Sequence, residues 1–267
     1  MRVELPTEVE NNRSQANSIS VNDALVYVED SRDCFNRYQQ HRVRVVNQQQ
    51  AIAKVDADLI IEVRKSKRRG TTVKVTVDFK QKYLEKRLRS SQLNDFGQRG
   101  ITWHIVVIEY YDWDEDKEEV VRVQVPLDQI LETGNKQDGP CVLSMLEAML
   151  KMVRVELPFV ENIILVSDNA NCYHSKNMLF PICFLNQLTL QTKEKKPLIV
   201  KYLHPETQDG KGACDSHAAV AGTHVDRHFI CTRKDGTLTY NEACTPRQLA
   251  NALCSNGGVK NSGKMAD

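Results

Sequence analysis

Alternating apolar and polar positions mark strands in the middle of the chain. In residues 72–79, Val73, Val75 and Val77 alternate with polar neighbours, and β-branched residues in this alternation favour a half-buried strand. The strands predicted from this and similar runs span residues 72–79, 101–111, 119–125, 162–167 and 198–203. The second and third are separated only by a short acidic loop, which predicts a hairpin.

Apolar residues at three- and four-residue steps mark the helices. The helices predicted in this way span residues 139–156, 175–190 and 213–229, and a fourth begins at Thr245. Pro158 ends the first of them, and Pro181 predicts a kink or a late start in the second. Pro246 suits the first position of the last helix, because the N–H that proline lacks has no partner there.

The N-terminal part is more polar and less regular. Residues 1–20 show no periodicity, and residues 21–59 predict one or two helices with a role in packing or dimer contact. A short edge strand is expected at residues 60–63. The predicted division is an N-terminal polar segment with helices, a central domain and a C-terminal extension, at residues 1–64, 65–232 and 233–267.

Composition excludes few functions. The chain has 267 residues, 41% of them hydrophobic, and a formal net charge of +1. No apolar run approaches the roughly 18 residues that a membrane span requires, and the N-terminus lacks the apolar region of a secretory signal. The eight cysteines are spread singly, which favours intracellular thiols over a disulfide framework.

The charge is unevenly distributed. Between residues 64 and 89 there are eleven Lys and Arg against two acids, whereas residues 109–119 hold seven acids. The basic stretch suits a polyanionic partner, although two solvated faces would give the same pattern. The run at 64–69, Arg-Lys-Ser-Lys-Arg-Arg, also fits a nuclear-import signal, and a nuclear location is therefore expected.

Two predicted strands end in aspartate. Asp78 follows the valines of the first strand, and Asp168 follows the fourth. Carboxylates that lie side by side at one edge of a sheet would form a site for a hard divalent cation. Each residue alone also has an ordinary structural explanation: Asp78 can bind a loop amide, and Asp168 can cap a helix.

The element order resembles the ribonuclease-H-like fold, and three motifs resemble the catalytic core of DDE transposases and integrases. These motifs are Thr-Val-Asp-Phe-Lys around Asp78, Leu-Val-Ser-Asp-Asn-Ala around Asp168, and the run from His204 to Asp215. The last is similar to the integrase pattern Asn-Pro-x-Ser-x-Gly-x-x-Glu. The resemblance covers about residues 70–230. It implies an α/β domain with a mixed five-stranded sheet flanked by helices, here preceded by an N-terminal helical region.

The resemblance also implies the chemistry. Asp78, Asp168 and Asp215 would be the catalytic acids and, with Glu206, would bind two Mg²⁺ or Mn²⁺ ions. Such ions activate a water or a 3′-hydroxyl and stabilise the leaving oxygen of a phosphodiester. DNA would be the partner, and a homo-oligomer is also expected. The expected nucleic-acid-binding residues are Lys65, Lys67, Arg68, Arg69, Lys80, Lys82 and Lys211.

The third acid remains open between Asp215, Glu206, Asp209 and Glu242. Cys214-Asp-Ser-His217 also resembles the Cys/Asp-x-x-His signature of eukaryotic cut-and-paste transposases, in which the catalytic glutamate follows later. The histidines at 217, 224 and 228, bracketed by cysteines at 214 and 231, could form a zinc site. Helix histidines near DNA phosphates are the alternative.

Three functions fit these features. The first is transposon-derived, metal-dependent DNA cleavage or strand transfer by a carboxylate triad. The second is an inactive, domesticated module that keeps the fold and binds nucleic acid. The third is a nuclease from another ribonuclease-H-like branch, acting on RNA–DNA hybrids or ends. The sequence departs from a complete transposase because it shows no zinc-finger or helix-turn-helix pattern for binding element ends.

Overall fold

The computed structural model describes residues 21–85, 100–132, 136–191, 198–205, 212–232 and 238–259. The chain forms two compact units, residues 1–48 and residues 49–267. The boundary falls within one helix, α2 (Val21–Ser66). The second unit contains the sheet and every candidate site residue that the structure describes.

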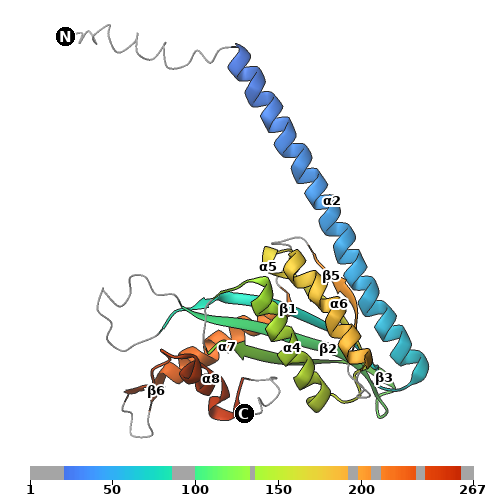
Figure 1. The fold of residues 1–267 in the computed structure, drawn as a ribbon, viewed down its shortest axis with the longest axis vertical. Coiled ribbons are helices and arrows are strands. Elements are labelled where there is room, and N and C mark those ends of the chain that lie inside the picture. Colours follow the sequence, from blue (N-terminus) through green and yellow to red (C-terminus); the bar gives the residue numbers. More distant parts are fainter. Residues whose placement is uncertain are drawn as a thin grey trace, which may run out of the picture. The chain divides into compact units, whose positions relative to one another are not determined.

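The second unit is built on a five-stranded mixed sheet. Its strands are β1 (Thr72–Tyr83), β2 (Ile101–Asp114), β3 (Glu119–Ile130), β4 (Asn162–Ser167) and β5 (Leu198–Leu203). They are arranged in the order β3-β2-β1-β4-β5. Figure 1 draws the strands as arrows and labels β1, β2, β3 and β5. β1, β2 and β3 pair antiparallel, whereas β1, β4 and β5 pair parallel. This is the ribonuclease-H-like α/β arrangement that the sequence predicted.

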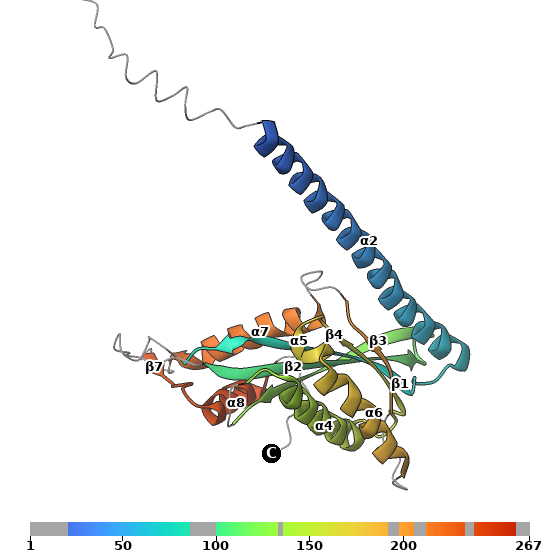
Figure 2. The same ribbon diagram turned by 45° about the horizontal axis from the view of Figure 1, so that its top comes forward.

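Helices cover both faces of the sheet (Figure 2). The apolar face of β1 packs against helices α4 (Gly139–Glu156), α5 (Asn171–His174) and α6 (Lys176–Gln191). Val73, Val75 and Val77 are almost fully buried in this layer. Apolar residues of β2 on the opposite face pack against α7 (Ala213–Phe229) and α8 (Pro246–Cys254).

The helix starts confirm the sequence signals. The Asp138 carboxylate caps α4 by accepting the Cys141 N–H at 3.1 Å. Thr245 caps α8, where its hydroxyl and the Gln248 side chain form a reciprocal capping box. α7 begins and ends at the residues predicted, and Pro181 lies inside α6.

The N-terminal prediction was partly wrong. The one or two helices expected at 21–59 are a single helix, α2. It also includes residues 60–63, where an edge strand was expected. Leu59 and Val63 are buried and Ile61 is exposed. Burial therefore follows a four-residue step, which a helix satisfies and a strand does not.

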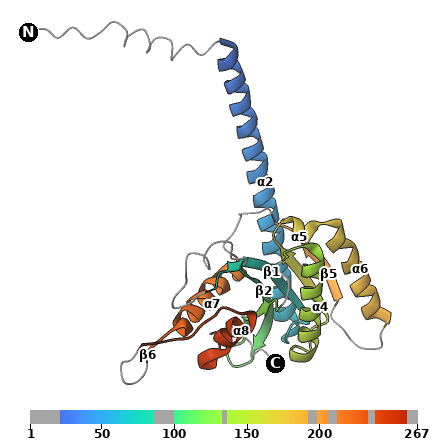
Figure 3. The same cartoon turned by 60° about the vertical axis from the view of Figure 1, so that its left-hand side comes forward.

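The remaining elements are short. β6 (Ile230–Thr232) continues from the end of α7 (Figure 3) and pairs antiparallel with β7 (Leu238–Tyr240). A 3₁₀ turn, η1 (Ser255–Gly257), follows α8. Among the residues that the structure describes, none of the helices combines the length and apolar character needed to cross a bilayer.

Candidate carboxylate site

Asp78 and Asp168 lie at the same edge of the β1–β4 pair. The two strands are parallel, and their last paired residues are Val77 and Ser167. The next residue on each strand is an aspartate, as the sequence predicted. Asp78 is not the end of its strand, however, because β1 continues to Tyr83 through its pairing with β2.

The third acid, Asp215, comes from a helix and not from the sheet. It lies in the first turn of α7, where its carboxylate accepts the Gly212 N–H at 3.0 Å. Asp78, Asp168 and Asp215 all line one cavity of about 440 Å³. The sheet and α7 thus bring together the three acids that the resemblance implied.

The three carboxylates interact electrostatically. Burial above all, together with the nearby negative charges of Asp168 and Asp215, raises the pKa of the Asp78 carboxyl to about 6, against a hydrogen bond from the Phe79 N–H. The Asp168 carboxylate accepts the Ala170 N–H at 3.1 Å, which fixes the turn after β4.

The three aspartates suit a hard cation, because such cations prefer carboxylate oxygens as ligands. Among the residues that the structure describes, however, no group of three or more His, Cys, Asp or Glu side chains is close enough to hold a metal ion. Two alternative third acids, Glu206 and Asp209, lie outside the described residues. Glu242 is exposed and does not line the cavity.

A buried charged network forms another wall of the same cavity, and the sequence analysis missed it. The Lys74 ammonium lies 2.6 Å from Asp56 of α2 and 2.9 Å from Glu109 of β2. The other Glu109 oxygen accepts hydrogen bonds from Arg122 and, at 2.6 Å, from Gln124, both on β3. The available signal was Glu109, a single acid inside the apolar and aromatic run of β2.

A second polar group supports the end of β4. The Ser167 hydroxyl lies 3.0 Å from the Tyr202 hydroxyl and 3.3 Å from His204 Nδ1. Both partners come from β5 or the residue that follows it, and Ser167 is almost fully buried. These contacts tie β5 to β4 directly beside Asp168.

The predicted nucleic-acid-binding residues occupy different places. Lys65 lies in the last turn of α2, and Lys67, Arg68 and Arg69 lie between α2 and β1; none of the four lines the cavity. The Arg69 guanidinium is paired with Asp112 at 2.6 Å. Lys211 lies outside the described residues.

Lys80 and Lys82 follow Asp78 on β1. The Lys80 ammonium donates to the Ala218 carbonyl of α7 at 2.8 Å and lies 4.2 Å from the centre of the Trp103 ring. A Cβ atom added to Gly222 would meet this ammonium at 2.7 Å. Lys80 therefore packs β1 against α7 instead of extending toward solvent.

The proposed zinc ligands bind other protein groups. His217 Nε2 lies 2.8 Å from the Asp128 carboxylate, which also accepts from Trp103 Nε1 at 2.8 Å. Burial raises the pKa of the Cys214 thiol, which donates to the Thr76 carbonyl and so stays protonated. His224 contacts Ser255, and the Cys231 side chain lies outside the described residues.

Two further residues have structural roles. His104 is fully buried in the sheet, and burial lowers its pKa to about 4. Cys172 lies beside Asp168 and is partly packed into the core. Burial raises the pKa of its thiol to about 11, so Cys172 behaves as a small, largely apolar residue.

The fold and the acid cluster define a ribonuclease-H-like α/β protein with three aspartates in one cavity. A family model described as a domain of unknown function (DUF8701) matches residues 58–253, and the chain belongs to this family. No curated protein matches the chain.

Two solved structures are similar over most of the chain. One is a Mos1 transposase paired-end complex with the left transposon end, at 13% identity and a TM-score of 0.32, covering 79% of this chain. This chain spans 62% of that one. The other is an endonuclease V of Ciona intestinalis in complex with a 23mer DNA containing an inosine followed by a ribo-adenosine. It is 9% identical, with a TM-score of 0.26, covering 80% of this chain and 92% of that one.

Proposed function

We propose that the chain is a divalent-metal-dependent enzyme that cleaves or transfers DNA strands. The observation that carries the proposal is the meeting of Asp78 and Asp168 at the edge of two parallel strands, with Asp215 lining the same cavity. Sheet packing alone does not require three acids in one cavity, and their mutual repulsion has a cost that a bound cation would remove.

Asp78, Asp168 and Asp215 would hold Mg²⁺ or Mn²⁺, and Glu206 is the further candidate ligand. Such metal ions supply an activated water or hydroxyl nucleophile and stabilise the leaving oxygen of a phosphodiester. The residues themselves provide rigid placement. Asp78 is fixed by the pairing of β1 with β2, opposite Ile105, and Asp168 by the Ala170 N–H and the β4–β5 contacts.

DNA is the proposed substrate, and a nuclear site of action is proposed from the run at 64–69, which fits a nuclear-import signal. The support comes from the basic stretch at 64–69 and from the phosphodiester chemistry that the acids suit. The basic residues lie before the start of β1, nine to fourteen residues before Asp78. From Arg69 to Asp78 an extended chain covers roughly 30 Å, so a DNA duplex lying along the sheet could contact both places.

A non-catalytic DNA-binding module is the second candidate. It is favoured by the Asp215 carboxylate, which is already engaged by the Gly212 N–H, and by the absence of a converged three-ligand group among the described residues. In this alternative the acids remain as structural residues, and the basic stretch alone supplies affinity.

Metal-dependent nicking of supercoiled DNA separates the two candidates. The enzyme should nick DNA with Mg²⁺ or Mn²⁺, and Asp168→Asn should abolish nicking. In the absence of metal the variant should bind DNA as well as the native chain or slightly tighter, because one carboxylate that repels phosphate is gone. Metal-independent binding without nicking by the native chain would support the module instead.

A further inference from the structure

The cavity that holds the three aspartates has two chemically different ends. One end carries Asp78, Asp168 and Asp215. Lys74, Glu109 and Arg122 line the other end, together with Ile52 of α2, and the two cations there are paired with Glu109. A ligand that reaches from the aspartates to this end would therefore meet a guanidinium that still has unused donors.

Arg122 is the cation at this end that can meet a ligand. The Lys74 side chain is 7% exposed and is held by two carboxylates, Asp56 and Glu109. The Arg122 side chain is 50% exposed and contacts Glu109 through one terminal nitrogen. A guanidinium has five N–H donors in a planar fork, so donors remain for a phosphate.

Arg122 is also fixed in position. Glu109 is almost fully buried, and its two oxygens are held by Lys74, Gln124 and Arg122 itself. A guanidinium anchored in this way loses less side-chain entropy on binding than a free surface arginine. Such supporting contacts are typical of a functional site that is organised before its ligand arrives.

We propose that Arg122 binds a backbone phosphate of the nucleic-acid strand whose phosphodiester lies at the aspartates. The inference rests on the proposed function for the identity of the ligand. Arg122 lies near Lys74, because both pair with Glu109. Lys74 and Asp78 are four residues apart on β1, which is about 13 Å in a strand. Since stacked phosphates rise about 3.4 Å per nucleotide along one strand, the contacted phosphate lies two to four nucleotides from the aspartates.

The neighbouring side chains suit this ligand. Ile52 offers an apolar surface for a sugar or a base, and Gln49 lies beside it on α2. The cavity volume of about 440 Å³ falls within the range of small-ligand sites and accommodates one nucleotide unit. Arg122 would thus fix the strand, while Asp78, Asp168 and Asp215 remain available for metal.

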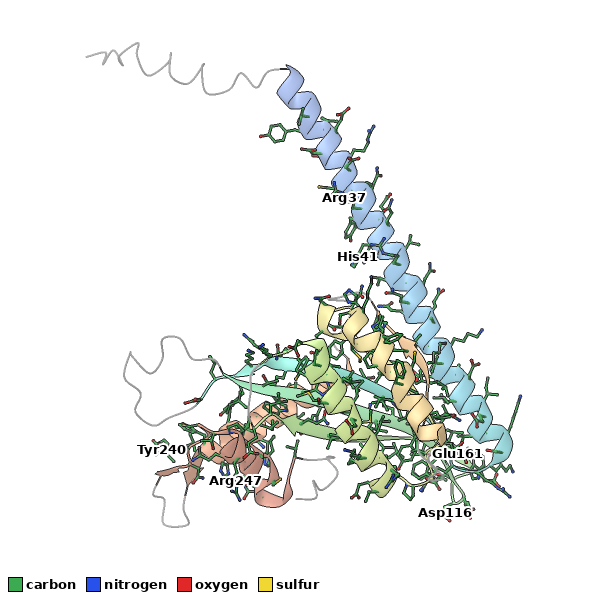
Figure 4. The ribbon with its side chains drawn as sticks, viewed as in Figure 1. Arg37, His41, Asp116, Glu161, Tyr240 and Arg247 are labelled. Carbon is green, nitrogen blue, oxygen red and sulfur yellow. The ribbon has the colours of Figure 1, made fainter. Side chains whose placement is uncertain are left out.

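The test is DNA affinity in metal-free buffer, measured over a series of salt concentrations. Arg122→Gln should weaken binding about 10-fold, as expected for losing a charge-assisted hydrogen bond. It should also lower the slope of log K against log salt by about 0.9 for duplex DNA or about 0.7 for a single strand. Arg247→Gln is the matched control, because Arg247 lies on α8 outside the cavity (Figure 4).

A scan of oligonucleotides with single methylphosphonate substitutions identifies the contacted phosphate. One neutral position should weaken binding of the native chain about 10-fold and leave Arg122→Gln unaffected, because the partner of that phosphate is already gone. Arg122→Lys should recover part of the affinity. A cooperative melting transition above the assay temperature would show that each variant is folded, although Arg122→Gln should melt lower because the buried Glu109 loses a partner.

The outcomes separate this inference from the proposed catalysis. Equal affinity and salt slope for Arg122→Gln and Arg247→Gln would overturn the Arg122 assignment, whether or not the chain nicks DNA. A methylphosphonate position that weakens binding of the native chain but not of Arg122→Gln would establish the contact, even in a chain that shows no nicking.

Discussion

Asp78 and Asp168 are adjacent across two parallel strands, one residue beyond the Val77–Ser167 pair. The first consequence is electrostatic. Burial above all, and then the negative charge of Asp168, disfavours ionisation of the partly buried Asp78 and raises its pKa. The pair is thus a destabilising feature of the metal-free protein, and this property can be measured.

Asp78→Asn should stabilise the protein at pH 7–8 and have little effect near pH 4. The folded-state pKa of about 6 lies above the unfolded value of about 3.9, so stability is lost as pH rises through that interval. After a discount for partial exposure, the gain is about 1–2 kcal/mol, or roughly 2–6 °C in melting temperature.

Melting curves of the native chain and the variant over pH 4–8 check this prediction. Buried His104 works in the opposite direction, because its lowered pKa costs stability as pH falls from about 6.5 toward 4. Both proteins contain His104, so its contribution cancels when their melting temperatures are subtracted at each pH. A melting-temperature difference that is constant with pH would contradict the electrostatic explanation.

The Lys74–Glu109 pair should show strong coupling. Lys74→Met alone leaves the buried Glu109 charge short of one partner and should cost about 3–5 kcal/mol. The double variant Lys74→Met/Glu109→Leu should recover most of this loss, because Asp56 and Arg122 are exposed enough to be solvated. Urea unfolding of the two single variants and the double variant measures the coupling, and additive losses would refute it.

Lys80 should matter for stability and not for DNA binding. Lys80→Met removes the hydrogen bond to Ala218 and the contact with the Trp103 ring, at a cost of about 1–2 kcal/mol. DNA affinity should stay within about twofold of the native value. Gly222→Ala offers an independent check, since its added Cβ displaces the Lys80 ammonium in the native chain and should be better tolerated after Lys80→Met.

The basic segment should contribute non-specific affinity unequally. Lys65→Gln with Arg68→Gln should lower the salt slope of duplex binding by about two ions and leave sequence preference unchanged. Arg69→Gln should lower it less, because its guanidinium is paired with Asp112. Electrophoretic or fluorescence titrations at several salt concentrations measure this, and an equal loss from all three positions would show that Arg69 leaves Asp112 to bind DNA.

The sequence predicted those features that depend on local pattern. The strand alternation, the helix caps and the position of α7 depend on residues close together in the chain. The meeting of Asp78 with Asp168, which are 90 residues apart, followed only from comparing the element order with the ribonuclease-H-like fold. Asp215 was reached through its motif, since its position in the first turn of α7 follows from the predicted helix start.

The misses have one physical cause. The partners of Lys74, Lys80 and His217 lie on other elements, and a charged residue in a sequence does not show whether it faces solvent or a buried partner. Lys80 therefore counted as a DNA contact although it packs against α7. Arg122 was overlooked because only the β2–β3 register brings it beside Glu109.

Magnesium binding tests the central claim most directly. Added Mg²⁺ at about 100 times its dissociation constant should stabilise the native chain by about 2.7 kcal/mol, or roughly 5–10 °C, because it binds only the folded site. Asp168→Asn should lose this shift, whereas Asp116→Asn, a control in the exposed β2–β3 turn (Figure 4), should keep it. A native chain whose melting temperature does not respond to Mg²⁺ or Mn²⁺, or an equal shift in all three proteins, would contradict the assignment of Asp78 and Asp168 as a metal site.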